Sequence, residues 1–323
     1  MWLALLASKN ITDLKEALAL VRRSRNAWGL SIRIANVGNI KSQDGMLDRN
    51  CTSPDFSAPS STQLLTRFNT YFRTQEATST ELLSSALALR YQVYCLERKF
   101  ENADRYADCL ERDELDRHSV HGLIVYRPRE EAIGAARLIL PECPVTSLPV
   151  QLLLRKHDID AANYFPVEKT AEVSRFAISR EFRRRLSGDN AADFDEGARL
   201  RRGGDCFSNL PCLGLAQILV QMSLARGITH WAAMMEPKLL RMLSAMGIHF
   251  TAVGPLVSHH GIRQPAFCHV PGMLKKLLEE KPQHWDIVTD AGNLCYPEEY
   301  KILDRGLNAA DLTRVRQPAI GRL

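Results

Sequence analysis

A regular pattern of apolar residues between Leu83 and Tyr94 has the spacing of a helix. A helix is indicated by the apolar positions Leu83, Ala86, Leu87 and Tyr94. Thr78 and Glu81 have the spacing of a capping box, so we expect this helix to begin at Thr78. Arg90 lies on the same apolar face, so a charged side chain is predicted to point toward the core.

Strand patterns follow this helix. Residues His121–Tyr126 and Ala132–Leu140 are apolar runs of strand length, and the short polar segment 127–131 between them predicts a hairpin. Ala171–Ser179 reads as a third strand. The first half of the predicted sheet is therefore antiparallel.

The second half of the chain alternates between helix and strand. Leu210–Gly227 is apolar on nearly every side, as a buried helix should be. The further expected elements are a strand at Thr229–Met235, a helix at Glu236–Gly247, a strand at Ile248–Leu256, and one strand and one helix from Ala266 onward. This order predicts a mixed α/β sheet flanked by helices.

The first 60 residues differ from the rest. Ile11–Ser24 can form an amphipathic helix, and residues 36–63 are rich in Ser, Asn, Asp, Gly and Pro, as linkers are. We expect residues 1–60 to be an extension and linker, and residues 61–323 to form one domain. The extension is either a regulatory arm or a segment upstream of a true start at Met46.

Composition limits the class of protein. The 323 residues are 45% apolar and 24% charged with a net charge of +5, which is ordinary for a globular protein. No apolar run approaches the ~20 residues of a spanning helix, and the opening is interrupted too soon for a signal peptide, so a cytoplasmic location is expected. Basic residues alternate with acidic ones, which argues against nucleic-acid binding. The eight cysteines are scattered without a C-x-x-C pair, so free thiols are expected.

Charged residues occur inside segments that should be half buried. Arg90, Asp113, Asp116 and Arg137 would each be costly to bury alone, but they can be buried together as a cluster of opposite charges. Such a cluster could hold the N-terminal part of the domain over a cleft. The alternative is that the acidic residues form a solvated loop.

Four segments in order resemble a known family. "LRYQVYCLERKF", "ERDELD", "GAARLIL" and "EVSRFAIS" are similar to segments of the acyl-homoserine-lactone synthases and N-acyl amino acid synthases of the GNAT superfamily, and above all to the PEP-CTERM/exosortase-associated acyltransferases. The resemblance covers about residues 65–275. It implies a GNAT-like fold and a transferase activity.

The resemblance implies a set of site residues. Glu172 and Arg175 match catalytic positions, and the implied substrate-binding residues are Arg90, Tyr94, Asp113, Asp116, Arg137, Ser174 and Phe176. Tyr94 stands where the lactone synthases usually have Phe, and residues 99–106 lack their Trp. These departures lie in the segment that closes over the amine donor, and they favour the amino acid branch over recognition of S-adenosylmethionine.

Glu172 and Arg175 are three positions apart on a predicted strand. Side chains at that spacing face opposite sides unless the strand is bulged. The resembled fold carries a bulge here, through which the pantetheine arm of an acyl donor passes and where backbone N–H groups can bind the thioester oxygen. Glu172 is then the candidate general base. Its alternative role is an ion-pair partner for Arg90 or Arg137.

The start of the buried helix carries the candidate donor site. Pro211-x-x-Gly214-x-Ala216 keeps the small residues of the phosphate loop of acetyl-coenzyme-A-dependent relatives but lacks its leading Gln or Arg. The predicted donor-binding residues are Leu213, Gly214, Leu215 and Ala216. We expect no permanently bound cofactor, and an acyl-phosphopantetheine on acyl carrier protein, or acyl-coenzyme A, as the donor.

Two further patterns are weaker. His259, His260 and the Cys268–His269 pair have no matching second cluster, so we expect no metal site. The arginines of 183–185 and 199–202 either steer docking of an acidic acyl carrier protein or belong to a solvated loop, because acidic residues lie between them.

The sequence thus predicts an N-acyltransferase that moves a fatty acyl group from acyl carrier protein to the amine of a small molecule, an amino acid in the favoured case. The alternatives are an acetyl-coenzyme-A-dependent N-acetyltransferase, an acyl-homoserine-lactone synthase, or a non-catalytic module that binds an acyl carrier.

Overall fold

The computed structural model describes residues 61–141, 148–187, 209–258 and 261–296. The proposed extension of residues 1–60 lies outside this part of the chain, so its role stays a prediction. The described residues belong to one compact unit, Ser57–Leu323. No helix among them is long and apolar enough to cross a membrane.

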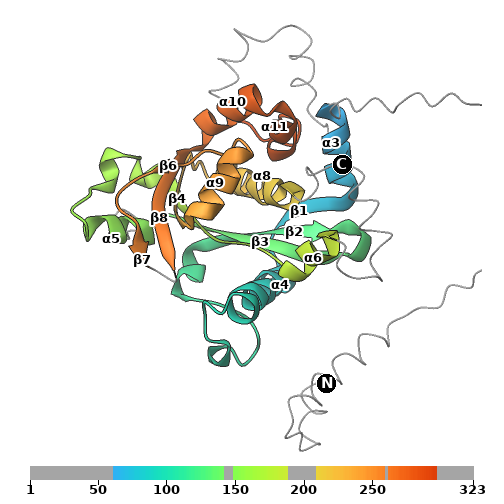
Figure 1. Ribbon diagram of the computed structural model, residues 1–323, viewed down its shortest axis with the longest axis horizontal. Coiled ribbons are helices and arrows are strands. Elements are labelled where there is room, and N and C mark those ends of the chain that lie inside the picture. Colours follow the sequence, from blue (N-terminus) through green and yellow to red (C-terminus); the bar gives the residue numbers. More distant parts are fainter. Residues whose placement is uncertain (1–60, 142–147, 188–208, 259–260, 297–323) are drawn as a thin grey trace, which may run out of the picture. The chain divides into compact units, whose positions relative to one another are not determined.

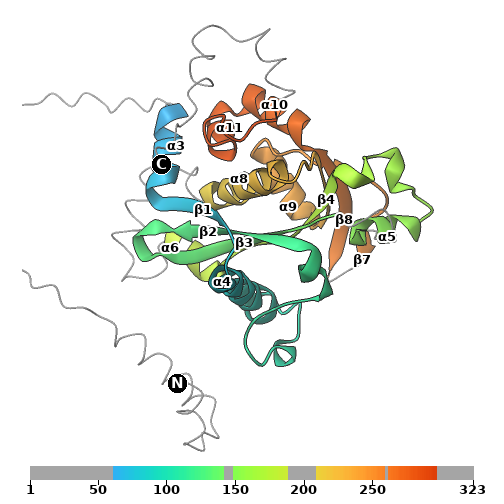
Figure 2. The same ribbon diagram turned by 180° about the vertical axis from the view of Figure 1, so that it is seen from behind.

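A mixed sheet of eight strands forms the framework (Figures 1 and 2). The strand order is β1-β2-β3-β4-β5-β8-β6, with β7 paired to β8. The strands are β1 Phe72–Glu76, β2 Ser119–Tyr126, β3 Glu131–Ile139, β4 Thr170–Ile178, β5 His230–Met235, β6 Thr251–Ala252, β7 Val257–Ser258 and β8 Ile262–His269. Strands β1 to β4 are antiparallel neighbours and β4 is parallel to β5, which confirms the predicted mixed α/β architecture.

Helices cover both faces of the sheet. In Figure 1, α8, α10 and α11 lie above the sheet and α4 lies below it. The α-helices are α3 Ser61–Tyr71, α4 Thr80–Arg90, α5 Pro149–Arg155, α6 Arg180–Ser187, α8 Leu210–Leu224, α9 Pro237–Ala245, α10 Val270–Glu280 and α11 Pro282–Val288. A π-helix, Tyr91–Glu97, directly continues α4, and 3-10 turns include Ala103–Arg105 and Glu114–His118.

Several predicted boundaries change. Helix α4 begins after Ser79, whose side chain accepts a hydrogen bond from the Leu82 N–H at 3.3 Å, so the capping box at Thr78 was wrong by one residue. Thr251–Ala252 is the only strand within the predicted Ile248–Leu256 segment. The hairpin of β2 and β3 and the strand β4 are confirmed.

Helix α8 is the centre of the main core. Thirteen of its 15 residues are buried, as its unbroken apolar sequence predicts. It packs against β1, β2 and β3 on the side opposite α4. Gly214 makes this close approach possible, because a Cβ there would overlap the Ile124 side chain and lie 3.1 Å from the Phe68 ring.

We therefore predict that Gly214→Ala lowers the free energy of unfolding by about 1–3 kcal/mol, since Ile124 and Phe68 are fully packed and cannot move aside without strain. Denaturant unfolding measures this loss. Gln221→Ala, at an exposed position of the same helix, is the matched control and should change the value by less than about 0.5 kcal/mol. Equal effects of the two changes would show that Gly214 is not needed for packing.

Candidate active site

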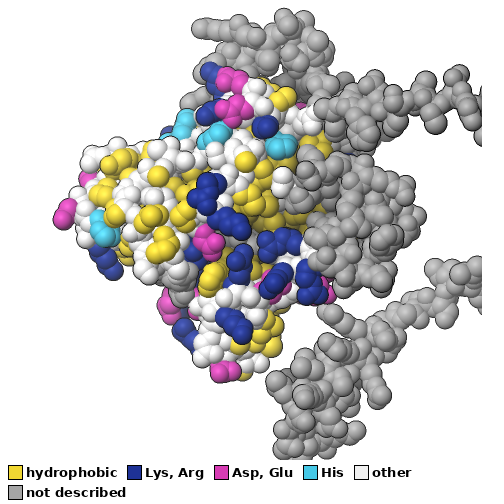
Figure 3. Space-filling model, viewed as in Figure 1, with side chains coloured by type: hydrophobic (Ala, Val, Ile, Leu, Met, Phe, Trp, Pro, Cys, Tyr) yellow, Lys and Arg dark blue, Asp and Glu magenta, His cyan; other side chains and the backbone are white. Residues whose placement is uncertain are grey.

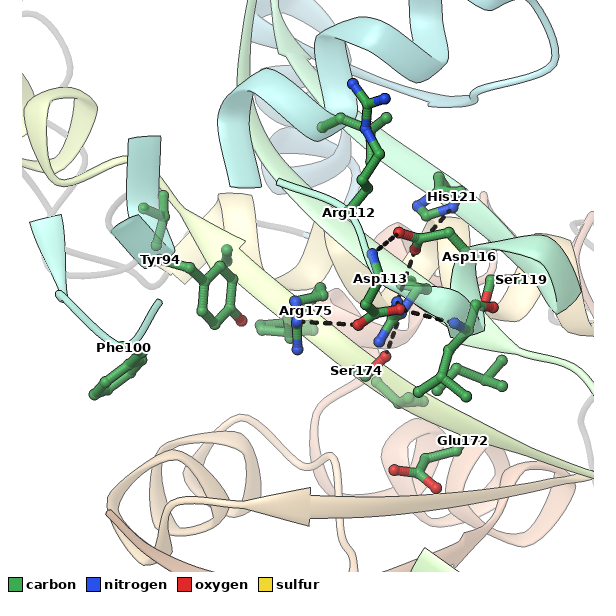
Figure 4. A pocket seen from close by; sticks show the side chains of 18 of the residues that line it. Tyr94, Phe100, Arg112, Asp113, Asp116, Ser119, His121, Glu172, Ser174 and Arg175 are labelled. Atoms are coloured by element: carbon green, nitrogen blue, oxygen red, sulfur yellow. Dashed lines mark hydrogen bonds and ion pairs between the residues drawn. The ribbon is translucent and has the colours of Figure 1, made fainter. Parts of the chain in front are cut away.

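Three arginines from separate elements converge on one side of the sheet. Figure 4 shows one of them, Arg175, beside Asp113. Arg90 ends α4, Arg137 lies on β3 and Arg175 lies on β4. Arg90 and Arg137 are each only 1% exposed. Burial of a guanidinium requires paired carboxylates, so the partners of these arginines define the site.

Glu111 links two of the arginines. Its carboxylate accepts from Arg90 Nε at 2.5 Å and from Arg175 Nη2 at 2.7 Å, and it is fully buried. Burial alone would raise the pKa of Glu111, but the bonds from Arg175 and Arg90 hold it below its usual value. Glu111 is thus a permanently charged bridge between the end of α4 and β4.

Asp113 and Asp116 complete the cluster from the 3-10 turn Glu114–His118, where they form a capping box with each other. Asp116 accepts from Arg90 Nη1 and from Arg137 Nη1, both at 2.7 Å. Asp113 accepts from Arg137 Nη1 at 2.6 Å. Although burial opposes it, the Arg90 contact keeps the pKa of Asp116 well below its usual value. The expected charge cluster is therefore present, and the solvated-loop alternative is wrong for these residues.

Strand β4 is bulged at the predicted place. Arg137 pairs with Ser174 and Ala135 with Ala177, so β4 has two residues where β3 has one. Arg175 adopts a left-handed conformation with φ of 50°, which turns its side chain toward Glu111. The bulge brings Arg175 to the side of the sheet that Glu172 faces, as the sequence analysis required, and Ser174 faces that side through the ordinary alternation of a strand.

Strands β4 and β5 separate beyond the bulge. Their parallel pairing runs only from Thr170–His230 to Val173–Ala233, although β4 continues to Ile178. Backbone groups on this edge of β4 have no ladder partner on β5 within the described strands. They are available to a substrate that enters between the strands.

Glu172 differs from the other carboxylates. It is 3% exposed, and its Oε2 accepts a hydrogen bond from the Val150 N–H, at the start of α5, at 2.8 Å. Burial raises the pKa of Glu172 to about 7. Arg90 and Arg137 pair with Glu111, Asp113 and Asp116 instead, so the alternative role as their ion-pair partner is not supported. The role of general base stays a prediction.

Tyr94 lies beside the cluster on the π-helix. The guanidinium carbon of Arg175 is 5.1 Å from the centre of the Tyr94 ring. A π-helix after α4 shifts the register of the chain, and such turns are frequent at functional sites. Ser174 accepts from Arg137 Nε at 2.9 Å, and Phe176 is half-buried against the main core.

A cavity of about 1780 Å³ contains these groups. Its lining includes Tyr94, Asp113, Asp116, Arg137, Glu172, Ser174, Arg175 and Phe176. Apolar side chains from α5, β5 and α9 line another part of it, among them Leu153, Met234 and Leu239. The cavity therefore joins a charged region to an apolar one.

The predicted donor-binding residues occupy the first turns of α8. Leu213, Leu215 and Ala216 are buried in the core, and Gly214 faces Ile124 and Phe68. Asn209 and Cys212, at the start of the same helix, line the cavity. Close packing against Ile124 and Phe68 accounts for the glycine at position 214. The binding of a phosphate by this loop stays a prediction.

Metal-binding clusters are absent from the described ranges. His269 instead caps α10, where its Nδ1 accepts from the Gly272 N–H at 3.2 Å. His259, His260 and the 199–202 arginines lie outside the described residues.

Sequence reasoning missed two site residues. Glu111 is the first residue of the "ERDELD" segment, and its signal was only its place beside Asp113 and Asp116. His121 lies on β2 opposite Arg137, is 5% exposed, and has a pKa that burial lowers to about 4. Its imidazole is therefore neutral, and nothing in its sequence surroundings indicated this position.

Comparison with known protein families gives a match to part of the chain. A family model described as "Acetyltransferase (GNAT) domain" matches residues 89–189. No curated protein matches the chain. Residues 89–189, about a third of the chain, are thus similar to a GNAT-type acetyltransferase domain.

Solved structures similar to this chain include TofI and two synthases. TofI, in a ternary complex with an inhibitor and MTA, is 19% identical, with coverage of 64% of this chain and 96% of that chain and a TM-score of 0.45. BjaI, a CoA-dependent acyl-homoserine lactone synthase with SAM and isopentyl-CoA, is 20% identical over 68% and 88% of the two chains, with a TM-score of 0.43. FeeM, an N-acyl amino acid synthase from uncultured soil microbes, is 16% identical over 64% and 96%, with a TM-score of 0.42.

The charge cluster predicts a large loss of stability for Arg90→Ala. The change leaves Asp116 and Glu111 without one buried partner, and we expect a cost of about 3–5 kcal/mol in thermal or denaturant unfolding. Arg90→Lys should recover only part of it, because the forked geometry is lost. Arg112→Ala is the control: this arginine is 51% exposed and pairs with Asp108 at the surface, so we expect a loss below about 1 kcal/mol. Similar losses for the two alanine variants would contradict a buried cluster.

Proposed function

We propose that this acyltransferase moves a fatty acyl group from acyl carrier protein to the α-amine of an amino acid. The proposal rests mainly on Glu172, a buried carboxyl with a pKa of about 7 that lines the cavity at the split between β4 and β5. A carboxylate with that pKa can accept a proton near neutral pH, whereas Glu111 and Asp116 have a pKa held below the usual value.

The reaction follows from these positions. Deprotonated Glu172 takes a proton from the acceptor's ammonium group, directly or through a water, and the freed amine attacks the thioester carbon. The new C–N bond forms, and the unpaired edge of β4 offers N–H groups to the developing oxyanion. The C–S bond then breaks, and the surplus proton that remains on the nitrogen passes through water to the departing thiolate. Water carries this proton because the chain has no tyrosine between Tyr164 and Tyr296 to supply one.

An amino acid acceptor is favoured by Arg175. This side chain is 19% exposed, more than Arg90 or Arg137, and it lines the cavity. Its Nε and Nη2 bind Glu111 and Asp113, while its Nη1 has no hydrogen-bond partner in the described part of the chain. A guanidinium with a spare donor suits a carboxylate. Arg175 would hold the acceptor's carboxylate while Glu172 receives the proton of its amine.

A carrier-protein donor is favoured by the charge around the cavity. Figure 3 shows Lys and Arg side chains gathered across the middle of one face. Arg98, Arg183 and Lys238 are exposed and line the cavity. Arg185 is held by Glu131 at 2.8 Å and is therefore less available to a partner protein. A basic rim attracts an acidic protein. The cytoplasmic location and the exosortase association remain predictions from the sequence.

Glu172→Gln should lower kcat by about 10²–10⁴ with the fold intact, because an amide cannot accept the proton. In the parent enzyme kcat should fall about tenfold per pH unit below pH 7, as the carboxyl becomes protonated. Steady-state kinetics across pH 5–9 measure both effects. Glu168→Gln, an exposed neighbour, is the control. A loss of less than threefold in the Glu172→Gln variant would rule out the base.

The pH dependence of protein stability gives an independent measurement of the pKa of Glu172. The pKa of Glu172 is raised in the folded state. Below about pH 4.5 the carboxyl is protonated in the folded and the unfolded protein, so no charge is buried. As pH rises from there to about 7, the unfolded protein loses this proton first and the free energy of unfolding falls, and it levels off once the buried carboxyl ionises too. Glu172→Gln should therefore be more stable than the parent above pH 7, by about 3 kcal/mol. The difference should vanish near pH 4. A difference that does not vary with pH would contradict the raised pKa.

The donor is tested with one acyl chain on two carriers. If acyl carrier protein is the donor, kcat/KM for acyl carrier protein should exceed that for acyl-coenzyme A and fall with salt, because exposed charges beyond about 8 Å are screened at physiological ionic strength. Changing both Arg183 and Arg184 to Ala should reduce kcat/KM for acyl carrier protein, mainly by slowing the association of the carrier with the enzyme. Arg185→Ala is the matched control within the same helix. Equal or better kcat/KM for acyl-coenzyme A, insensitive to salt and to the arginine changes, would favour the coenzyme A-dependent alternative.

A further inference from the structure

Four side chains form a continuous row from β4 to β8. The guanidinium of Arg175 is 5.1 Å from the Tyr94 ring, the Tyr94 and Phe100 rings are 6.3 Å apart, and the guanidinium of Arg263 is 5.3 Å from the Phe100 ring. We call Arg175, Tyr94, Phe100 and Arg263 the aromatic strap. Figure 4 shows Phe100, Tyr94 and Arg175 in sequence beside the carboxylates of the cluster.

The aromatic strap crosses the place where the sheet divides. Pairing between β4 and β5 ends at Val173 and Ala233, while β5 stays paired with β8 as far as Met235 and Gln264. Arg175 therefore lies on one side of the split and Arg263 on the other. All four strap residues line the cavity. The strap thus turns an open slot between the two halves of the sheet into a closed ring.

The contacts of the strap differ in strength. Arg175 is fixed by Glu111 and Asp113 through charged hydrogen bonds. Phe100 is fixed to Tyr94 within the same segment, because its backbone N–H donates to the Tyr94 carbonyl at 2.8 Å. Arg263 is anchored on its own half by Glu236 at 3.2 Å. The contact of Arg263 with Phe100 joins the two halves. The Phe100 ring is half-buried and the Arg263 side chain is 12% exposed, and a cation–π contact of this kind is weaker than the buried ion pairs that hold Arg175.

We infer that the contact between Phe100 and Arg263 is a latch on the donor slot. When it is closed, a pantetheine arm with bulky groups at both ends cannot move sideways between β4 and β5. When it opens, the arm enters or leaves, and the contact then reforms over it. This inference rests on the proposed use of an acyl thioester donor.

A latch has a kinetic signature that a binding residue lacks. Weakening a latch speeds entry and exit equally and leaves Kd unchanged, whereas loss of a ligand contact raises only the dissociation rate. The probe is a fluorescent thioether analogue of acyl-phosphopantetheine, which cannot react. Stopped-flow mixing gives its association and dissociation rate constants with the full-length protein.

Arg263→Met and Phe100→Leu break the same contact from opposite sides. Each should raise both rate constants by the same factor, about threefold to thirtyfold, with Kd unchanged. Arg241→Met, an exposed arginine on α9 outside the cavity lining, is the control and should change neither constant.

Three results would overturn the latch. A rise in dissociation alone would make Phe100 or Arg263 a donor contact. Unchanged rate constants in both variants would mean that the arm passes without opening the strap. If the analogue does not bind the parent protein at all, the thioester donor itself is wrong and the proposed function fails with it. The first two results leave the proposed function standing.

Discussion

The carboxylate that Arg90 and Arg175 share is the interaction on which the site depends. Glu111 has no exposed surface, and its backbone N–H also donates to the Leu87 carbonyl of α4 at 3.2 Å. Glu111 therefore connects three parts of the structure: the end of α4, the loop that carries Glu111 itself, and the bulge of β4. Without this charge two guanidiniums would compete for Asp113 and Asp116, and Arg175, with its strained left-handed backbone, would keep only Asp113 of the two carboxylates that accept its hydrogen bonds.

The site assigns different tasks to chemically similar side chains. Glu111, Asp113 and Asp116 lie against guanidiniums, which hold the pKa of Glu111 and of Asp116 below the usual value. Glu172, on the same side of the sheet, has a backbone N–H as its hydrogen-bond partner and a raised pKa. Carboxyls in contrasting surroundings can divide structural and proton-transfer roles in this way. The separation follows from the bulge, which places Arg175 toward the cluster and leaves Glu172 beside α5.

The parts of the fold that sequence predicts well are those with strong local patterns. The β2–β3 hairpin and α8 are apolar enough to be recognised without tertiary information. Strand β1 was missed because only Phe72 of its five residues is buried, so its sequence shows no apolar pattern. Its strand conformation depends on pairing with β2, which the sequence does not reveal. The helix α5 was missed too, although its Val150 N–H binds Glu172. For the site, residue types indicated a cluster, but which carboxylate pairs with which arginine depends on a π-helix and a loop that no periodicity predicts.

The burial of α8 affects how strongly salt screens the electrostatic potential of this helix. Protein surrounds this helix along most of its length, and its first turn opens at Asn209 and Cys212 on the cavity. Counter-ions cannot approach the sides of such a helix, so salt screens the positive potential at its start less than it screens the exposed arginines of α6. A negative donor group that binds as proposed would meet two sources of attraction: a long-range one that weakens as ionic strength rises, and a short-range one that persists. A charged group that has already reached the interior should feel nearly the same field in dilute buffer and in concentrated salt.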